Sequence, residues 1–515
     1  MIAQNGSPRH FAAVHGVANG TVRANEYFKE INYRSRRHVD GSPRSAALRP
    51  SGIPAPVADD HKPKECAKDA SIPPRGRSIT DAFFAPQQAA DTQNNMVFNS
   101  VNEHCLNAIV ELSETRTVEA SEDIYDERGM KLWAKGKPVS AELQEKLLRR
   151  KLAKPLEATL AVDGAVAFGD IVGTCRARLD ENPLFRRIVN REALALIDGM
   201  RNIALPQPLR LLLTSAHAKG SNNFKHAIGT ILVSAGIAAR LTLNEHDAQH
   251  LLMAALLHDL GEMYINPDYL RDSYRLPPAE WKHVASHPRI GQLLIAELTT
   301  LPATVGLCVA QHHERLDGSG YPNQLERSKH NRLGSWLAVA DSVAAILARG
   351  DSGAPLRAAL AMRIVPEEFD HQAVAVVTQA LRHGDDSFGA PADTGFVAGV
   401  KASMERVVAT IRRAESLRNT AGTPFLRQTA ESALLLLYNL DKSLRSTGVV
   451  EATSLGADVL DAEVVAEINL VVREVDWRMR NLARNLHLRA EGYQDKSCLQ
   501  HLSPLIGALD GSAAG

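Results

Sequence analysis

Histidine is concentrated in one part of this 515-residue chain. Eight of its 19 histidines lie between positions 226 and 313, and several of them are followed directly by Asp or Glu. A single histidine on a helix is usually a satisfied polar residue, whereas imidazoles gathered beside carboxylates are the donor set of a transition-metal site. This region therefore predicts metal-dependent chemistry.

Seven residues have a sequence context that could bring them to one centre, because each lies at an end of an apolar segment or inside one. They are His226, His258, Asp259, His287, His312, His313 and Asp341. The intervals between successive groups are 25 to 32 residues. Each interval is about one helix plus a connection, so successive helices of a bundle would each contribute a ligand. The carboxylate of Asp341 lies in the apolar run WLAVADSVAAIL, where burial requires a partner.

Seven ligand groups are too many for one ordinary metal ion and fit two ions with a carboxylate between them. Imidazole suits iron, zinc, nickel, copper or manganese better than magnesium or calcium. Two roughly octahedral ions would keep positions for water and for substrate oxygens. That is the layout of a two-metal hydrolytic site, in which metal-bound hydroxide attacks phosphorus in line.

The overall composition excludes several other classes of protein. Lys and Arg together number 59, as do Asp and Glu, so the large basic excess of a nucleic-acid-coating protein is missing and we expect no nucleic-acid partner. The five cysteines are scattered and form no C-x-x-C, which argues against a disulfide framework or a zinc ribbon. No apolar run is long enough for a transmembrane helix, and the N-terminus lacks the apolar core of a signal peptide. We therefore expect no membrane contact and a cytoplasmic location.

The patterning predicts a mainly α-helical chain of four parts. Aromatic residues are only 5%, and Ala and Leu dominate the apolar set, which favours helices. Residues 1–95 are rich in Ser, Pro, Gly and Arg without helical or strand periodicity and predict a disordered tail. Residues 96–165 predict a small α+β regulatory module, residues 166–390 the helical metal-binding domain, and residues 391–515 a helical C-terminal extension.

The small module has recognisable element signals. Val118 to Tyr125 predicts a strand and Met130 to Ala134 a returning strand. Ser140 is placed to cap a helix from Ala141 to about Leu152. None of these segments has the residue types of a catalytic site.

Two further groups of residues have plain interpretations. His246 and His250 are four apart, as chelating pairs often are, but we interpret them as structural or surface residues. Five arginines on the predicted helix 460–490 are interpreted as a solvated face, with a homodimer or protein-partner contact as the alternative. They are Arg473, Arg478, Arg480, Arg484 and Arg489.

Residues of about 200–390 resemble the HD-GYP domain, a subfamily of the HD metal-dependent phosphohydrolases. Three motifs carry the resemblance: His258-Asp259-Leu260-Gly261, His287-Pro288-x-x-Gly291, and the run HHERLDGSGYP that begins at His312. The resemblance implies an HD-type helical bundle. It also implies hydrolysis of the second messenger cyclic di-GMP, to the linear dinucleotide and then GMP, at a bimetallic or trimetallic centre.

The resemblance also implies residue roles. The seven residues named above match the metal ligands, with iron or manganese as the expected ions, and Asp259 matches the bridging carboxylate at the catalytic centre. Gly318, Gly320 and Tyr321 match the signature loop near the substrate entrance, where the glycines would let the backbone approach the nucleotide. Arg315 is expected to contact a phosphate, with a role in pinning the loop as the alternative.

Two positions depart from the family pattern. Members usually have a lysine three residues after the HD aspartate, where an ammonium can contact a substrate phosphate, and this chain has Glu262. Members with a third metal usually have a glutamate four residues before the first histidine, and this chain has Asn222, which favours two metals.

Glu262 leaves two functions open. The main hypothesis is a cyclic di-GMP phosphodiesterase, and the alternative is a non-hydrolytic cyclic di-GMP receptor or an adaptor for protein partners in signalling. If one α-helix ran through residues 258 and 262, they would share a face, so Glu262 would point toward the centre. There it would serve the metals, unless it turned to solvent.

Overall fold

The computed structural model describes residues 98, 100–148, 150–218, 222–271, 276–350, 353–382, 396–446, 449 and 462–511. The predicted disordered tail, residues 1–95, lies outside the described residues. The described part is mainly helical, as expected. No helix in these ranges combines the length and the apolar character needed to cross a bilayer.

The N-terminal module is mixed, as predicted, but its strands are shorter. Its elements are α3 (Glu103–Ser113), β1 (Val118–Ala120), β2 (Ile124–Tyr125), β3 (Lys131–Trp133), α4 (Ala141–Leu147), α5 (Leu156–Thr159) and β4 (Leu160–Val162). The expected single strand is divided after Ala120. β1 pairs antiparallel with β4, so that Val118 lies opposite Val162, while β2 pairs with β3. The side chain of Ser140 caps α4 as predicted, although the helix already ends at Leu147.

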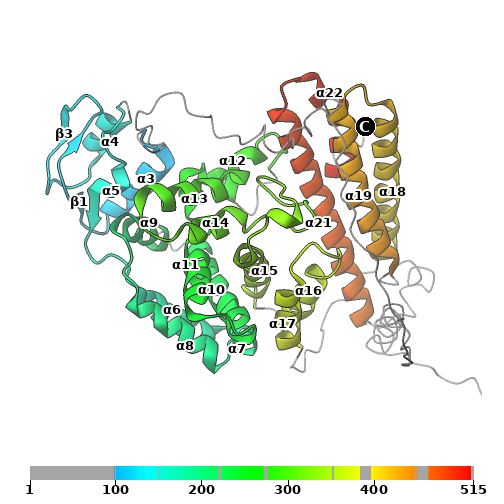
Figure 1. The fold of residues 1–515 in the computed structure, drawn as a ribbon, viewed down its shortest axis with the longest axis horizontal. Helices are drawn as coiled ribbons and strands as arrows, with labels where there is room; N and C mark the ends of the chain where they lie inside the picture. The colour runs from blue at the N-terminus through cyan, green and yellow to red at the C-terminus, as the bar shows by residue number, and fades with distance from the viewer. Residues whose placement is uncertain are drawn as a thin grey trace, which may run out of the picture. The chain divides into compact units, whose positions relative to one another are not determined.

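Helices make up the next part of the chain (Figure 1). They are α6 (Phe168–Glu181), α7 (Pro183–Ile188), α8 (Arg191–Gly199), η2 (Met200–Asn202), α9 (Gln207–Ala218), α10 (Asn222–Arg240), α11 (Glu245–Leu257), η3 (Leu260–Tyr264), η4 (Pro267–Leu270), α12 (Trp281–Ala285), α13 (His287–Leu298), α14 (Ala303–Gln311), η5 (Arg327–Lys329), α15 (Arg332–Leu347), α16 (Ala354–Ala361) and α17 (His371–Leu381).

The helix α10 is the centre of this arrangement. Residues 227–238 are all buried. Such continuous burial is typical of a helix that is apolar on every face and surrounded by other helices. α10 packs against α15, α11 and α8, and α14 contacts both α11 and α15. These four helices, α10, α11, α14 and α15, together with α13, contain or adjoin all seven candidate ligands.

The C-terminal extension consists of α18 (Phe396–Thr420), α19 (Pro424–Ser446), α21 (Ala462–Gly492) and α22 (Ser497–Asp510). Its helices share a hydrophobic core of their own, which also takes in Ile364 and Val365 from the segment after α16. A second core runs from Phe98 to Leu381 and joins the small module to the helical domain. The domain boundaries stay predictions.

Close packing of α10 on α7 gives a test of this core. A Cβ atom at Gly236 would lie 2.5 Å from Cγ2 and 2.8 Å from the carbonyl oxygen of Ile188. We expect Gly236→Ala to lower the free energy of unfolding by about 1–3 kcal/mol, because the two helices would have to separate. Denaturant unfolding followed by circular dichroism measures the change.

The matched control is Gly173→Ala, in the exposed face of α6, where a Cβ atom meets nothing within 4 Å. Alanine should raise the free energy of unfolding there by about 0.5–1 kcal/mol, because it restricts the unfolded chain. Equal shifts of the two variants in the same direction would contradict the close contact of α10 with Ile188.

Candidate metal centre

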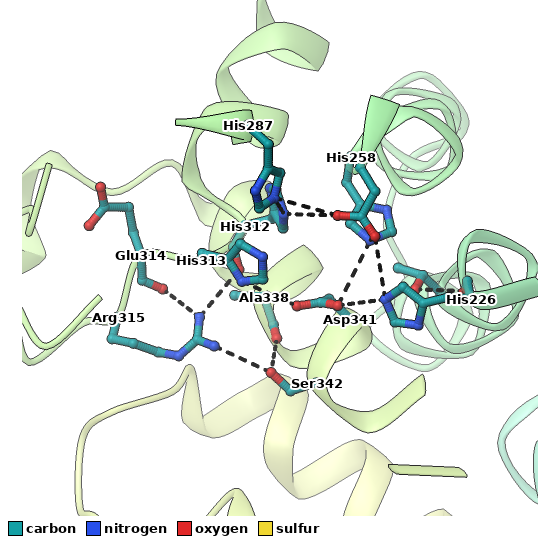
Figure 2. A network of polar contacts seen from close by, with 12 residues as sticks. His226, His258, His287, His312, His313, Glu314, Arg315, Ala338, Asp341 and Ser342 are labelled. Carbon is teal, nitrogen blue, oxygen red and sulfur yellow. Dashed lines mark hydrogen bonds and ion pairs between the residues drawn. The ribbon is translucent and has the colours of Figure 1, made fainter. Parts of the chain in front are cut away.

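The structure brings all seven sequence-predicted ligand residues together (Figure 2). Each of them lies within a helix or directly after one. His226 lies in the second turn of α10, which begins at Asn222. His258 and Asp259 directly follow α11, His287 is the first residue of α13, His312 and His313 directly follow α14, and Asp341 lies within α15.

The carboxylate of Asp259 faces imidazoles on both sides. Its Oδ2 atom lies 2.9 Å from Nε2 of His258 and 3.8 Å from Nε2 of His226. Its Oδ1 atom lies 3.5 Å from Nε2 of His287 and 3.6 Å from Nε2 of His312. One oxygen for each pair of histidines is the arrangement of a carboxylate that can bridge two metal ions.

Asp341 spans the same two sides. Its Oδ1 atom lies 2.8 Å from Nε2 of His226 and 3.8 Å from Nε2 of His258, and its Oδ2 atom lies 3.6 Å from Nδ1 of His313. The sequence predicted a bridging role for Asp259 alone. No sequence signal separates a carboxylate that binds one ion from a carboxylate that faces two.

Three of the histidines are oriented by the backbone in the same way. The Nδ1 atoms of His258, His287 and His312 lie 2.9, 2.8 and 2.6 Å from the carbonyl oxygens three residues earlier in the chain. These carbonyls belong to the last turns of α11, α12 and α14, where helix carbonyls lack intrahelical partners. With Nδ1–H donating to the backbone, Nε2 carries the lone pair and faces the centre.

These lone pairs require a cation. Nε2 of His287 and Nε2 of His312 lie 3.1 Å apart, and with both Nδ1 atoms donating to carbonyls, neither Nε2 atom has a proton to share. Nε2 of His258 is fully buried and lies 2.9 Å from the carboxylate oxygen Oδ2 of Asp259, so that a cation could be held between the two. The donor set therefore fits metal ions of the imidazole-binding class.

Two overlapping groups of side chains have the spacing of a metal site. One contains Asp259, His287, His312 and His313, and the other contains His226, His258 and Asp259, with all ligand atoms of a group within 4.8 Å of one another. Asp259 belongs to both groups. A two-ion centre that shares this carboxylate is what the geometry can accommodate.

Burial sets the protonation of the centre. Burial, together with neighbouring His312, lowers the pKa of His287 to about 4, and the pKa of His313 also falls well below its usual range for the same two reasons. Both imidazoles are therefore neutral near pH 7, as metal ligands must be. Burial lowers the pKa of His258 too, but the Asp259 carboxylate more than offsets it and raises the pKa to about 9. The Nε2 lone pair of His258 therefore carries a proton near pH 7 until a metal ion displaces it.

The signature loop is shaped by contacts with its own residues. A Cβ atom at Gly320 would lie 2.4 Å from the amide nitrogen of Arg315 and 2.5 Å from the carbonyl oxygen of His313, and Gly318 has a φ of 78°. The ring of Tyr321 stacks on the His313 ring with centroids 4.6 Å apart. These glycines are therefore required by the fold of the loop, whereas the sequence suggested an approach to substrate.

Arg315 is held by the protein. Its side chain is buried, and Nη1 donates to the carbonyl oxygens of His312 at 3.2 Å and Glu314 at 3.0 Å. Nη2 lies 3.4 Å from Oγ of Ser342 (Figure 2). The guanidinium lies over the ring of Phe369. These contacts favour the loop-pinning role over a contact with a phosphate.

Glu262 does not share an α-helical face with His258. α11 ends at Leu257, and the chain continues as the 3-10 helix η3 from Leu260 to Tyr264, so the expected i,i+4 geometry is wrong. The Glu262 carboxylate instead accepts a hydrogen bond from the side chain of Asn223. Burial and then the charge of Asp259 raise its pKa well above its usual range.

A cavity of about 240 Å³ adjoins the centre on this side. Its lining includes Asp259 and Glu262, with Asn223 from α10 and His104 from α3 of the small module. Asn223 and His104 could not be predicted as lining residues, because neither lies in a motif and only the fold brings α3 to this place. His246 and His250 are not part of this site. They form a separate group with Asp247 at the start of α11.

Comparison with known proteins gives consistent matches. The family model of the HD domain matches residues 210–371. The cyclic di-GMP phosphodiesterase PA4108 of Pseudomonas aeruginosa is 27% identical over 190 residues, which are 36% of this chain and 46% of that protein.

Two further relatives match the same way. The 3'3'-cGAMP-specific phosphodiesterase 3 of Vibrio cholerae is 28% identical over 30% of this chain and 34% of its own length. The cyclic di-GMP phosphodiesterase response regulator RpfG of Xanthomonas campestris pv. campestris is 37% identical over 22% of this chain and 30% of its own. The chain thus spans less than half the length of these relatives. Residues 210–371 thus match the HD-domain family, and the relatives named as cyclic di-GMP phosphodiesterases support the resemblance to the HD-GYP subfamily that the motifs at His258, His287 and His312 carry.

Proposed function

We propose that this protein is a metal-dependent phosphodiesterase that hydrolyses cyclic di-GMP at a two-metal centre. The observation that carries the proposal is the Asp259 carboxylate, whose two oxygens face different pairs of imidazoles at 2.9 to 3.8 Å. Two relatives are named as phosphodiesterases of cyclic di-GMP and one as a phosphodiesterase of 3'3'-cGAMP, which supports a cyclic dinucleotide as substrate.

Different residues of the chain would have different roles at such a two-metal site. Five histidines and two aspartates would hold the ions, with Asp259 and Asp341 each facing both positions. When bound, two such ions polarise phosphoryl oxygens and lower the pKa of water, as phosphoester hydrolysis needs. The helix-end carbonyls that accept from Nδ1 fix the ligand tautomers in advance, so that little reorganisation accompanies binding.

Substrate would reach the centre through the cavity that Asp259 lines. The apolar side chains of Phe224, Leu256 and Met263 line the same cavity and offer a surface for a nucleobase. Asn223 offers amide hydrogen bonds. The predicted substrate contacts of Gly318, Gly320 and Tyr321 stay predictions.

The receptor alternative keeps one specific observation in its favour. The Glu262 carboxylate lines the cavity at Asp259, where the family usually presents a lysine. A carboxylate there repels a phosphodiester and, when ionised, donates no hydrogen bond to it. Because the phosphate contact would be weaker, the domain would bind the dinucleotide without hydrolysing it rapidly.

The ligand assignment is tested by metal content. We expect the purified chain to hold about two transition-metal ions, and iron or manganese are the expected elements. Asp259→Ala removes the shared carboxylate and should empty or scramble both positions, with activity falling by several orders of magnitude. Inductively coupled plasma mass spectrometry and product chromatography measure the two effects.

The variants His246→Ala and His250→Ala are matched controls, because these histidines lie outside the seven-residue set and still form a metal-type group. They should keep the metal content and activity of the parent. A loss as large as that of Asp259→Ala would show that the ligand set is wrongly assigned.

Glu262→Lys tests the substrate contact. Within the part of the chain that the structure describes, the carboxylate accepts a hydrogen bond from Asn223 and forms none with the seven ligand residues, so its replacement should leave metal content unchanged. A lysine restores a cation in the cavity and should raise kcat/KM for cyclic di-GMP. Steady-state kinetics and metal analysis of one preparation measure both.

Glu262→Gln, which removes the charge without adding a cation, should give an intermediate kcat/KM. If Glu262→Lys instead loses metal and activity together, Glu262 serves the centre. Unchanged kinetics and unchanged metal content would leave position 262 without a role in binding or catalysis.

A further inference from the structure

The C-terminal helix α21 inserts a charged side chain into the domain that holds the metal-ligand residues. Arg478 was interpreted from the sequence as part of a solvated face, and this interpretation is wrong because the side chain is buried. Its Nε and Nη2 atoms lie 3.0 and 2.8 Å from Oε2 of Glu368, which is buried too. Nη2 also donates to the carbonyl oxygen of Ala361 at 2.7 Å, and Nη1 lies 2.7 Å from Oε2 of Glu474.

Glu368 connects this arginine to the signature loop. Its second oxygen, Oε1, lies 3.9 Å from Nε of Arg315, and its backbone carbonyl accepts from the amide of Leu316 at 2.9 Å. The carboxylate is thus hydrogen-bonded to Arg478 and only in loose contact with Arg315. A buried carboxylate between two guanidinium groups divides its attraction between them.

Arg315 in turn contacts the backbone and the neighbours of the candidate metal ligands. Its Nη1 atom binds the backbone carbonyl oxygens of His312 and Glu314, the residues on either side of His313. Its Nη2 atom reaches Ser342, the neighbour of Asp341 in α15. The guanidinium therefore ties the backbone of the paired histidines to the helix that carries Asp341 (Figure 2).

Other contacts of α21 reach the same segments. Asn485 donates to the carbonyl oxygens of Ser319 at 2.7 Å and Gly320 at 3.3 Å in the signature loop. Lys282 of α12, the short helix before His287, forms an ion pair with Glu491. α21 is thus in contact with the chain both before His287 and after His313.

We propose that Arg478 is a positioning residue for the candidate metal centre, because it holds Glu368 away from Arg315 and so leaves Arg315 bonded to the backbone beside His312 and His313. This role rests on the metal centre of the proposed function. Without Arg478, Arg315 is the remaining cation that the described residues place within 4 Å of the Glu368 carboxylate, which then draws the guanidinium toward itself. The backbone carbonyls of His312 and Glu314 then lose their donor, and the paired imidazoles move relative to Asp259.

The test measures binding of Co²⁺ alone, through the visible absorption of the ion, to metal-stripped full-length protein. Arg478→Met keeps the approximate volume of the side chain and removes its charge. We expect the dissociation constant for Co²⁺ to rise about 10- to 100-fold, the usual effect of losing a group that orients a ligand. The Co²⁺ spectrum should change in shape as well, because the imidazole geometry changes.

A double variant separates positioning from simple stabilisation. In Arg478→Met/Glu368→Gln the carboxylate that would draw Arg315 away is gone, so Co²⁺ affinity should return to within about threefold of the parent. Thermal unfolding is measured beside it. If Arg478→Met binds Co²⁺ like the parent while its Tm falls, the ion pair only stabilises the fold and the positioning role is rejected. A double variant as impaired as the single variant would also reject it.

Three controls keep the outcome unambiguous. Arg473→Met, on an exposed position of α21, should change neither affinity nor Tm. If Arg478→Met does not fold, Arg478→Lys replaces it: an ammonium keeps the charge but cannot reproduce the guanidinium contacts, so Co²⁺ should bind more weakly, and parent-like affinity would overturn the role. Asp259→Ala must lose Co²⁺. If it binds Co²⁺ like the parent, the proposed metal centre is wrong, independently of Arg478.

Discussion

The need to neutralise a set of inward-facing lone pairs governs the structure around α10. Three histidines donate from Nδ1 to helix-end carbonyls, which leaves three Nε2 lone pairs directed at one place. The carboxylates of Asp341, which is buried, and of Asp259, which is partly exposed, face the same place. The backbone hydrogen bonds therefore orient the ligand atoms of a metal site. The packing of the surrounding helices brings these atoms within a few ångströms of one another.

Much of this centre could be predicted from residue types and spacing. His258, His287 and His312 lie at helix boundaries that the apolar periodicity and the following Pro or turn residues mark, and the intervals between them match one helix each. The mainly α class and the HD-GYP resemblance are confirmed. The roles of the individual site residues and the domain boundaries stay predictions.

The failures have local causes. The chain after α11 becomes a 3-10 helix at Leu260, so the i,i+4 geometry expected for Glu262 was wrong, although its carboxylate still lines the cavity beside Asp259. The sequence did not show that Gly320 packs against the backbone of His313 and Arg315, where a Cβ atom has no room, and its predicted contact with the substrate stays a prediction. Arg478 lies 110 residues from Glu368. Nothing in the charged pattern of its own helix distinguishes it from Arg473, because burial of one arginine depends on a carboxylate that only the fold brings near.

The candidate ligands are far apart in the sequence, and this separation affects when the centre can bind its ions. His226 and Asp341 are 115 residues apart and lie 2.8 Å from each other at the centre. Ions bound between them, as proposed, would act as a cross-link that closes a long loop, so that metal release and unfolding of the helical domain would be thermodynamically linked. A ribosome that has not yet translated α15 has produced every histidine of the site and one of its two carboxylates. Such a nascent chain lacks the complete donor set, and full metal loading has to wait until α15 has been made.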